Sequence, residues 1–176
     1  IPYWAEFWPS CHIMNKEIIK HYDFDGEKVL ELGSGNGISG LGIPWKQGDI
    51  VYSDYDPNSF PFIRINHFLN HKCIPEILQL DWTKDDIPKT YNWILASDLA
   101  YEKRLFLPLI NTFKKHLNPT GKILLTEPER SFALPFFDLL VEHGFGFHKK
   151  VFAAHNNNKD IMIGFYEIFI KNKDLK

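Results

Sequence analysis

The stretch "VLELGSGNG", residues 29–37, decides the fold predicted for this chain. A short apolar run leads there into three glycines at alternate positions, Gly33, Gly35 and Gly37. Glycine permits tight turns and lets the backbone approach a ligand closely, so the pattern predicts a buried strand that runs into a ligand-binding loop. A helix beginning after the loop would direct its N-terminus at the ligand and favour a negatively charged group there.

Similar apolar runs recur along the chain. The stretches "KVLEL", "DIVYSD", "WILASD" and "KILLTE" are typical of strands buried on both faces of a parallel sheet. Amphipathic segments predicted to be helices alternate with them, at residues 10–21, 58–71, 103–117 and 131–143. This alternation indicates right-handed βαβ units and a doubly wound, mostly parallel α/β fold. The runs at 145–154 and 161–170 are separated only by the polar turn "NNNKD", which predicts an antiparallel hairpin.

Local signals predict the helix ends. Ser10 is expected to cap the first helix, the turn residues "NPTG" to end the third, and Gly144 to stop the fourth. The second helix is expected to carry an apolar face made of Phe62, Ile65 and Leu69.

The segment after the glycine loop, "GISGLGIPWKQG", contains two further glycines and Pro44. Proline at that depth removes a helical hydrogen bond and clashes with the preceding turn. The sequence therefore predicts a short or kinked helix there.

The composition sets limits on the kind of protein. At 176 residues, we expect a single domain over 1–176, with an aromatic segment and first helix in 1–22, a core in 23–152 and a terminal hairpin in 145–171. A net charge of −2 gives no basic field, so neither nucleic acid nor membrane is an expected partner. No apolar run approaches the ~20 residues of a membrane span, and the two distant cysteines form no CxxC pair, which favours a cytoplasmic protein with reduced thiols. We expect no metal site, and interpret His67 and His71 as a solvated or half-buried pair. The oligomeric state is not predicted.

An acidic residue follows the glycine loop at a sequence spacing that indicates nucleotide binding. Asp54 lies 21 residues after Gly33, close to the spacing at which a carboxylate meets a ribose diol. Asp56 is the rival acid, but it directly precedes Pro57 and is as easily a helix cap. The loop spacing is GxGxG, although Gly40 falls three residues after Gly37, so spacing alone leaves a dinucleotide open.

At this point the chain resembles the class I, seven-stranded S-adenosylmethionine-dependent methyltransferases. "ELGSGNG" is similar to their first motif, and "YSDYDP" to the acidic end of their second strand. The resemblance implies S-adenosylmethionine as cofactor, with Asp54 on the ribose hydroxyls. It also implies that the cofactor is bound by the first motif, at Glu31, Gly33, Ser34, Gly35 and Gly37.

The stretch "LQLDW" is similar to the third-strand motif of that family. The resemblance implies that Asp81 accepts a hydrogen bond from the adenine amino group and that Trp82 lies near the adenine ring. Plain packing of Trp82 in the core is an equally good interpretation.

The second half of the chain carries a further resemblance. "WILASDLAYE" contains a DxxY pattern at Asp98 and Tyr101 that is similar to the protein lysine methyltransferases of the family-16 type. "TEPER" and the opening "PYWAEFWPS" resemble the branch that methylates the β-subunit of electron transfer flavoprotein. The resemblance implies that Asp98 and Tyr101 are catalytic. Asp98 would contact both the cofactor and the incoming amine. Arg130 would bind an acidic substrate or pair with Glu127 or Glu129.

The aromatic opening has two interpretations. Trp4 and Trp8 could wall the cofactor crevice, with Trp4 toward the substrate, or their rings could pack into the core; the resemblance favours the wall. Asp98 could likewise be a helix cap, and Tyr101 a core ring.

The activity also stays open between alternatives. The acceptor could be a protein lysine or a small-molecule amine, and the chain could bind the cofactor without catalysis. A dehydrogenase is a weaker alternative, because the chain has no second domain.

Overall fold

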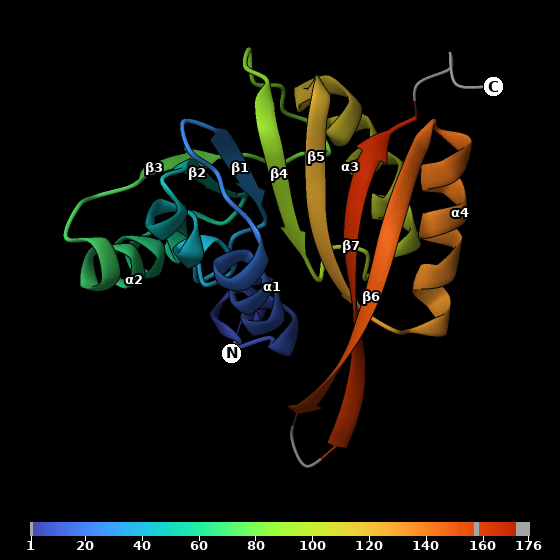
Figure 1. The fold of residues 1–176 in the computed structure, drawn as a ribbon, viewed down its shortest axis with the longest axis horizontal. Helices are drawn as coiled ribbons and strands as arrows, with labels where there is room; N and C mark the ends of the chain where they lie inside the picture. The colour runs from blue at the N-terminus through green and yellow to red at the C-terminus, as the bar shows by residue number, and fades with distance from the viewer. Residues whose placement is uncertain (1, 157–158, 172–176) are drawn as a thin grey trace.

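The computed structural model describes residues 2–156 and 159–171, and these form one sheet flanked by helices on both faces (Figure 1). The strand order is β3-β2-β1-β4-β5-β7-β6. Strands β1 to β5 pair in parallel, whereas β7 runs antiparallel between β5 and β6. The predicted doubly wound Rossmann-like sheet with a terminal antiparallel hairpin is therefore confirmed. The middle of "NNNKD" lies outside the described residues.

The elements follow the predicted alternation of strand and helix. The strands are β1 (Lys28–Leu32), β2 (Asp49–Asp54), β3 (Glu76–Gln79), β4 (Tyr91–Ser97), β5 (Leu117–Pro128), β6 (Phe145–Asn156) and β7 (Lys159–Ile170). The helices are α1 (Pro9–His21), α2 (Phe60–His71), α3 (Lys103–His116) and α4 (Leu134–Glu142).

The central strands are buried on both faces, as their continuous apolar runs predict. One core cluster joins alternate strand residues, such as Leu30, Ile94 and Ile123, to α3 and α4. The other joins the intervening positions, such as Val29 and Leu95, to α1 and α2. Alternation along each strand thus builds two cores from the same sheet.

Two helix ends differ from the prediction. Helix α1 begins at Pro9 with Trp8 at the N-cap, because proline is favoured at the first helical position, and Ser10 is already inside the helix. The residues of "NPTG" lie within β5, where Leu117 pairs with Tyr91 and Lys122 with Trp93, so they form a bulge rather than a free turn. Gly144, at φ +93°, ends α4 as expected.

No α-helix lies between the glycine loop and β2. Two short 3₁₀ turns, Ser39–Gly42 and Pro44–Lys46, take its place. The segment is therefore shorter than even a kinked helix, and anion binding at a helix N-terminus has no structural basis here.

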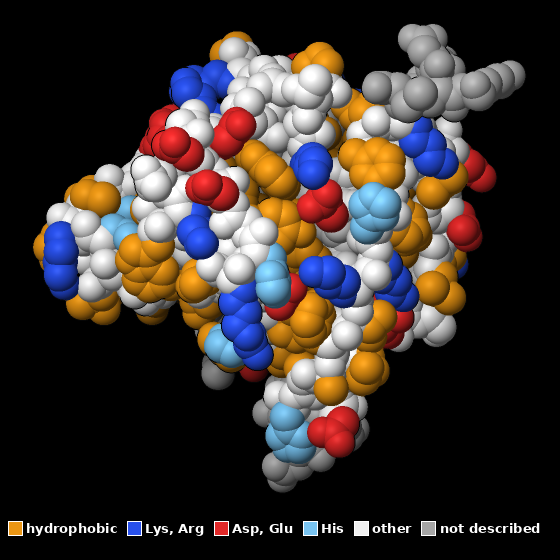
Figure 2. All heavy atoms as spheres, in the orientation of Figure 1, with side chains coloured by type: hydrophobic (Ala, Val, Ile, Leu, Met, Phe, Trp, Pro, Cys, Tyr) orange, Lys and Arg blue, Asp and Glu red, His pale blue; other side chains and the backbone are white. Residues whose placement is uncertain are grey.

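The predicted apolar face of α2 was wrong. Ile63 and His67 are the buried residues of this helix, whereas Phe62, Ile65 and Leu69 are exposed. Hydrophobic side chains gather accordingly over α2 at the left of Figure 2. The helix lies near the β3 edge of the sheet, and its buried residues Ile63 and His67 pack against the core.

The terminal hairpin extends beyond the sheet as a two-stranded arm (Figure 1). Pairing of β5 with β7 ends at Pro128 opposite Ile163, whereas β6 and β7 stay paired as far as Asn156 opposite Lys159. Since β7 is antiparallel to β5, the arm projects past the carboxyl ends of the parallel strands.

Candidate active site

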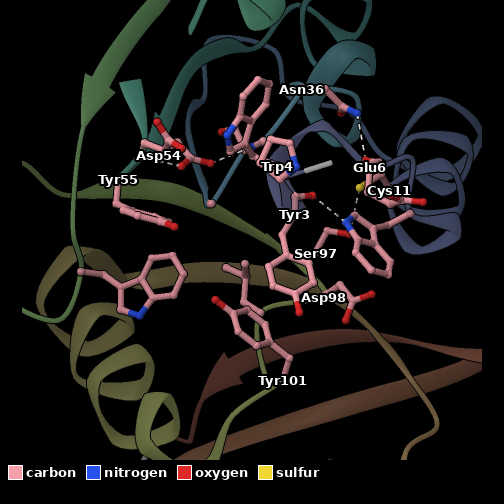
Figure 3. Close-up of a pocket in the computed structure, with 18 residues that line it drawn as sticks. Tyr3, Trp4, Glu6, Cys11, Asn36, Asp54, Tyr55, Ser97, Asp98 and Tyr101 are labelled. Carbon is pink, nitrogen blue, oxygen red and sulfur yellow. Dashed lines mark hydrogen bonds between the residues drawn. The ribbon is translucent and has the colours of Figure 1, made fainter. Parts of the chain in front are cut away.

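A cleft of about 260 Å³ opens at the carboxyl ends of β1, β2 and β4 (Figure 3). Open α/β sheets bind ligands at this edge. Asp54 and Tyr55 lie on one side of the view, and Asp98 and Tyr101 on the other. Nine of the residues proposed from sequence line the cleft: Trp4, Trp8, Gly33, Ser34, Gly35, Asp54, Trp82, Asp98 and Tyr101.

The glycine loop has the backbone that its sequence demands. Gly33, Gly35 and Gly37 have φ values of +56°, +54° and +76°, a region that other residues seldom adopt. A side-chain carbon on Gly35 would also lie 3.0 Å from the carbonyl oxygen of Trp4. Gly33 and Gly35 line the cleft, whereas Gly37 packs against Ile63 and Tyr52 behind it.

Asp54 is held by two backbone donors. The N–H of Gly35 donates to Oδ2 at 2.8 Å, and the N–H of Asp56 donates to Oδ1 at 3.0 Å. Burial raises the pKa of Asp54, while these hydrogen bonds act in the opposite direction. Each carboxylate oxygen accepts more than one hydrogen bond, so acceptor capacity remains on the cleft side. Asp56 accepts from the N–H of Asn58 at 2.9 Å and is the cap that its position before proline predicts.

Glu31 and Ser34 support the loop from behind. The Ser34 hydroxyl donates to the carbonyl oxygen of Glu31 at 3.2 Å and accepts from the N–H of Ser53 at 3.1 Å, which ties the loop to β2. The Glu31 carboxyl group is buried next to Ser39 and Gly40, and burial raises its pKa to about 8. Its position is beneath the loop rather than along the cleft.

The aromatic opening lies over the glycine loop. The Trp4 ring contacts Phe62 of α2 with 5.1 Å between centroids, and the Trp8 indole donates to the Tyr3 carbonyl at 3.1 Å. The Asn36 amide donates to the carbonyl oxygen of Glu6 at 3.3 Å. Tyr3 is 82% exposed. Residues 4–8, the covering segment, thus lie along one side of the cleft and do not fill the core, while Ile1 lies outside the described residues.

The two residues of the third-strand motif, Asp81 and Trp82, lie in different hollows. Trp82 packs against the core and also lines the cleft, so its packing role is confirmed and its place beside an adenine ring stays a prediction. Its indole nitrogen is buried, with no hydrogen-bond partner among the residues described. Asp81 instead accepts from Thr83 at 2.6 Å and Lys84 at 2.7 Å in an adjoining hollow, and these bonds lower its pKa.

Asp98 has a strained backbone at the end of β4. Its φ is +56°, and its N–H donates to the carbonyl oxygen of Thr126 at 2.8 Å. Helix α3 begins at Lys103 with Glu102 at the N-cap, so Asp98 is not the cap of that helix. Tyr101 is 42% exposed and is not a core ring. The alternative interpretations, a helix cap for Asp98 and a core ring for Tyr101, are therefore wrong.

Arg130 pairs with Asp98, a partner that the sequence did not suggest. Its two terminal nitrogens lie 2.9 and 3.3 Å from the two oxygens of Asp98. Burial raises the pKa of Asp98, and Arg130 opposes the shift. Glu127, a predicted partner, lies 3.5 Å from the guanidinium, whereas Glu129 is bound by Lys149 at 2.7 Å and by the Tyr166 hydroxyl at 3.0 Å.

Sequence reasoning missed several residues of the cleft. Tyr3, Cys11, Asn36, Tyr55, Ser97 and Leu99 also line it. Tyr55, Ser97 and Leu99 adjoin acids that were identified, so the rule that ligands lie past strand ends could have found them. Cys11 lies on α1 and carries no comparable signal in the sequence.

Within 2–156 and 159–171, no helix has the length and apolar character to cross a membrane. The same residues contain no group of three or more His, Cys, Asp or Glu side chains arranged to hold a metal ion. The rings of His67 and His71 lie 4.6 Å apart and contact each other, but His67 is only 3% exposed and bonds the Tyr52 hydroxyl, so the expectation of a solvated or half-buried pair was wrong for His67.

Comparison with known proteins gives a consistent result. The chain is 29% identical over 155 residues to EEF1A lysine methyltransferase 3 of Xenopus tropicalis, covering 83% of this chain and 65% of that protein. It is 27% identical over 147 residues to calmodulin-lysine N-methyltransferase of Arabidopsis thaliana, covering 74% of this chain and 47% of that protein. The chain thus spans less than two thirds of the length of these relatives.

A solved structure shares the fold. The N-methyltransferase NodS from Bradyrhizobium japonicum, in complex with S-adenosyl-L-homocysteine, superposes with a TM-score of 0.71 at 11% identity, over 94% of this chain and 91% of that one. The sequence model of one family, described as lysine methyltransferase, matches residues 4–143. This match includes the covering segment, the glycine loop, Asp98, Tyr101 and Arg130, and the chain belongs to the lysine methyltransferase family.

Proposed function

We propose that this chain is an S-adenosylmethionine-dependent methyltransferase that methylates the side-chain nitrogen of a lysine in a protein. One observation carries the proposal: a single cleft brings the glycine loop and Asp54 together with Asp98 and Tyr101. The first pair suits a nucleoside, and the second suits an ammonium group. Family membership and the relatives named above support the same assignment.

The cofactor fits the residues present. Asp54 offers unused acceptor capacity to the ribose hydroxyls, and glycine at position 35 lets the loop pack closely against the Trp4 backbone at the wall of the cleft. The buried indole nitrogen of Trp82 is a donor without a partner in the described structure, next to the place where an adenine would lie. We assign Glu31 and Ser34 to support of the loop, and Gly37 to its packing. Asp81 lines the adjoining hollow and not the cleft, so its side chain would have to turn to reach the adenine.

When bound, the cofactor supplies an electrophilic methyl group on a positively charged sulfur. The chain's residues then have to present a neutral amine in line with it. Lysine has an ordinary pKa of ~10.4, so its ammonium must lose a proton before the nitrogen can attack. Asp98 attracts and orients the ammonium, and the partly buried cleft favours the neutral amine. With the cofactor bound, Asp98 would hold the acceptor nitrogen in line with the methyl group; the nitrogen would exchange its proton for that group, the proton would leave to solvent, and the demethylated cofactor would be the leaving group.

Tyr101 and the covering segment complete this arrangement. The Tyr101 hydroxyl can accept from the amine, or its ring can pack on the lysine stem. Trp4 and Trp8 exclude water from the transferring methyl group, which strengthens electrostatic interactions there. Alignment of nitrogen, methyl and sulfur contributes up to ~7–11 kcal/mol in favourable systems.

A binding experiment tests the cofactor. Calorimetry with S-adenosylmethionine, S-adenosylhomocysteine and NAD should show binding of the first two and not of NAD. Tight NAD binding without a response to S-adenosylhomocysteine would instead indicate the dehydrogenase alternative.

A transfer experiment tests the acceptor class. The protein is incubated with isotopically labelled cofactor and a cell lysate, and protein is then separated from small molecules. Label in protein supports the proposal. Label only among metabolites indicates a small-molecule amine methyltransferase, and binding without any transfer indicates a non-catalytic cofactor-binding protein. Purified EEF1A and calmodulin, named for the relatives, are the first acceptors to try.

Other expectations remain proposals. We propose a single domain, a cytoplasmic location consistent with the free thiols of Cys11 and Cys73, and no nucleic-acid partner. On the face in Figure 2, positive and negative side chains are interspersed, which supports the last point.

A further inference from the structure

A second hollow opens beside the first, next to the hairpin arm. Trp8 and Asp98 line both, and the second is completed by Pro9, Pro128, Glu129 and Arg130 and by Ile161 and Met162 of β7. Asp98 therefore lies where the two meet. A ligand in the second hollow reaches the same carboxylate that faces the cofactor cleft.

The carboxylate of Asp98 already holds a cation. Arg130 contacts both of its oxygens, with the Asp98 side chain only 8% exposed and the Arg130 side chain 31% exposed. An acceptor ammonium placed on the same carboxylate would lie next to the guanidinium. Two positive charges at such a distance repel each other, especially where water is partly excluded.

A second acid lies within reach of Arg130. Oε1 of Glu127 is 3.5 Å from the nearest guanidinium nitrogen, is buried, and lacks a hydrogen-bond partner in the described structure. The other oxygen, Oε2, accepts from the N–H of Ala100 at 3.2 Å. A small movement of the guanidinium would give Arg130 a new partner and release Asp98.

The charge on Glu127 is suited to such an exchange. Burial, followed by repulsion from Asp98, raises the pKa of Glu127 to about 8. The group is thus largely neutral while Arg130 stays on Asp98. Arrival of the guanidinium would favour the ionised form.

We propose that Arg130 is a displaceable stand-in for the acceptor ammonium, and that the acceptor side chain enters through the second hollow and moves Arg130 from Asp98 to Glu127. This inference rests on the proposed function, because it assumes an amine acceptor at Asp98. It assigns the second hollow to an alkylammonium group, with the apolar side chains of Ile161 and Met162 beside its stem.

The test uses n-butylammonium, a mimic of the lysine side chain, titrated into the full chain with S-adenosylhomocysteine present and followed by NMR. Arg130→Gln removes the competing charge and should bind n-butylammonium at least tenfold more tightly than the wild type. Arg130→Lys keeps a cation and should stay within threefold of the wild type. Asp98→Asn should abolish binding.

Lys122→Gln is the matched control. Lys122 is 43% exposed and pairs with Glu167 at 2.8 Å, and neither residue lines either hollow, so its loss should leave affinity unchanged. Circular dichroism verifies that each variant is folded. Binding to Arg130→Gln that is no tighter than to the wild type, or undetectable in both, overturns the proposal. A tighter Arg130→Gln complex without any protein methylation would contradict the proposed function alone, and methylation without tighter binding would contradict this inference alone.

Discussion

The two sides of the cleft are built in different ways. On the cofactor side, hydrogen bonds between backbone and side chain join the end of β1 to the end of β2. They link Gly35 to Asp54 and Ser34 to Ser53. On the acceptor side, side chains from distant segments meet, as Arg130 meets Asp98 and the Ser97 hydroxyl donates to the Cys11 sulfur at 3.6 Å. A backbone-built site can be recognised from a motif, whereas a site built from side-chain pairs depends on the finished fold.

The two sides also differ in charge. Asp54 is satisfied by neutral backbone donors, whereas Asp98 and Glu127 are two buried acids beside one guanidinium. The first arrangement suits neutral hydroxyl groups, and the second suits a cation. We therefore expect substitutions on the cofactor side to alter affinity, and those on the acceptor side to alter rate.

The largest effect is expected from Asp98→Asn. Asparagine is nearly isosteric and tolerates positive φ, so the fold and cofactor affinity should persist while single-turnover methyl transfer falls at least about a hundredfold. Asp138→Asn, at an exposed position of α4, is the control for loss of an acidic charge. Full activity in Asp98→Asn would remove the main reason to place an amine on this side.

Next in size is the comparison of two acids on the cofactor side. Asp54→Ala should weaken S-adenosylhomocysteine binding by about 1.5–3 kcal/mol, because it removes charge-assisted hydrogen bonds to the ligand. Asp56→Ala should lower the free energy of unfolding by about 1 kcal/mol, as lost caps do, with little change in affinity. Calorimetry and chemical denaturation measure the two quantities, and the reverse order would show that the wrong carboxylate has been assigned to the ribose.

Alanine substitutions at two glycines with positive φ distinguish the effect of backbone strain from the effect of contact with the covering segment. Gly35→Ala and Gly26→Ala should each lower the free energy of unfolding by about 1–2 kcal/mol, since both hold left-handed conformations. Only Gly35 has a neighbour in the way, the Trp4 carbonyl, so only Gly35→Ala should weaken cofactor binding, by about tenfold. Equal affinities in the two variants would mean that the covering segment moves freely off the loop.

The smallest effect on the cleft itself is expected from Glu31, which should change the pH dependence of stability rather than binding or rate. Its pKa rises from 4.5 to about 8 on folding, so the native state binds more protons and the stability contributed by this group is lost as pH rises between those values. Glu31→Gln should therefore flatten the fall in unfolding free energy between pH 5 and 8.5, by an amount on the order of 1–3 kcal/mol. Glu142→Gln, at an exposed position, is the control. Identical pH profiles for wild type and Glu31→Gln would show that the carboxyl group ionises freely.

The sequence predicted the sheet, the hairpin, the glycine loop and Asp54 because each has a local signal: an apolar run, a short turn, or glycines at fixed spacing. It did not predict the Asp98–Arg130 pair, since 32 residues separate the two and either could have had nearer partners. The face of α2 was also misjudged. Helical spacing locates an apolar stripe, but only tertiary packing decides whether the core or another segment, here Trp4 on Phe62, covers part of it.

The most direct test of the account is to locate the methyl group. A protein acceptor found in the labelling experiment is incubated with trideuteromethyl-labelled cofactor and the wild type or Asp98→Asn, and fragment mass spectrometry then identifies the modified atom. The account predicts a trideuteromethyl group on a lysine side-chain nitrogen with the wild type, and loss of at least about 99% of that signal with Asp98→Asn. A methyl group on another kind of residue, or equal labelling by both proteins, would contradict it.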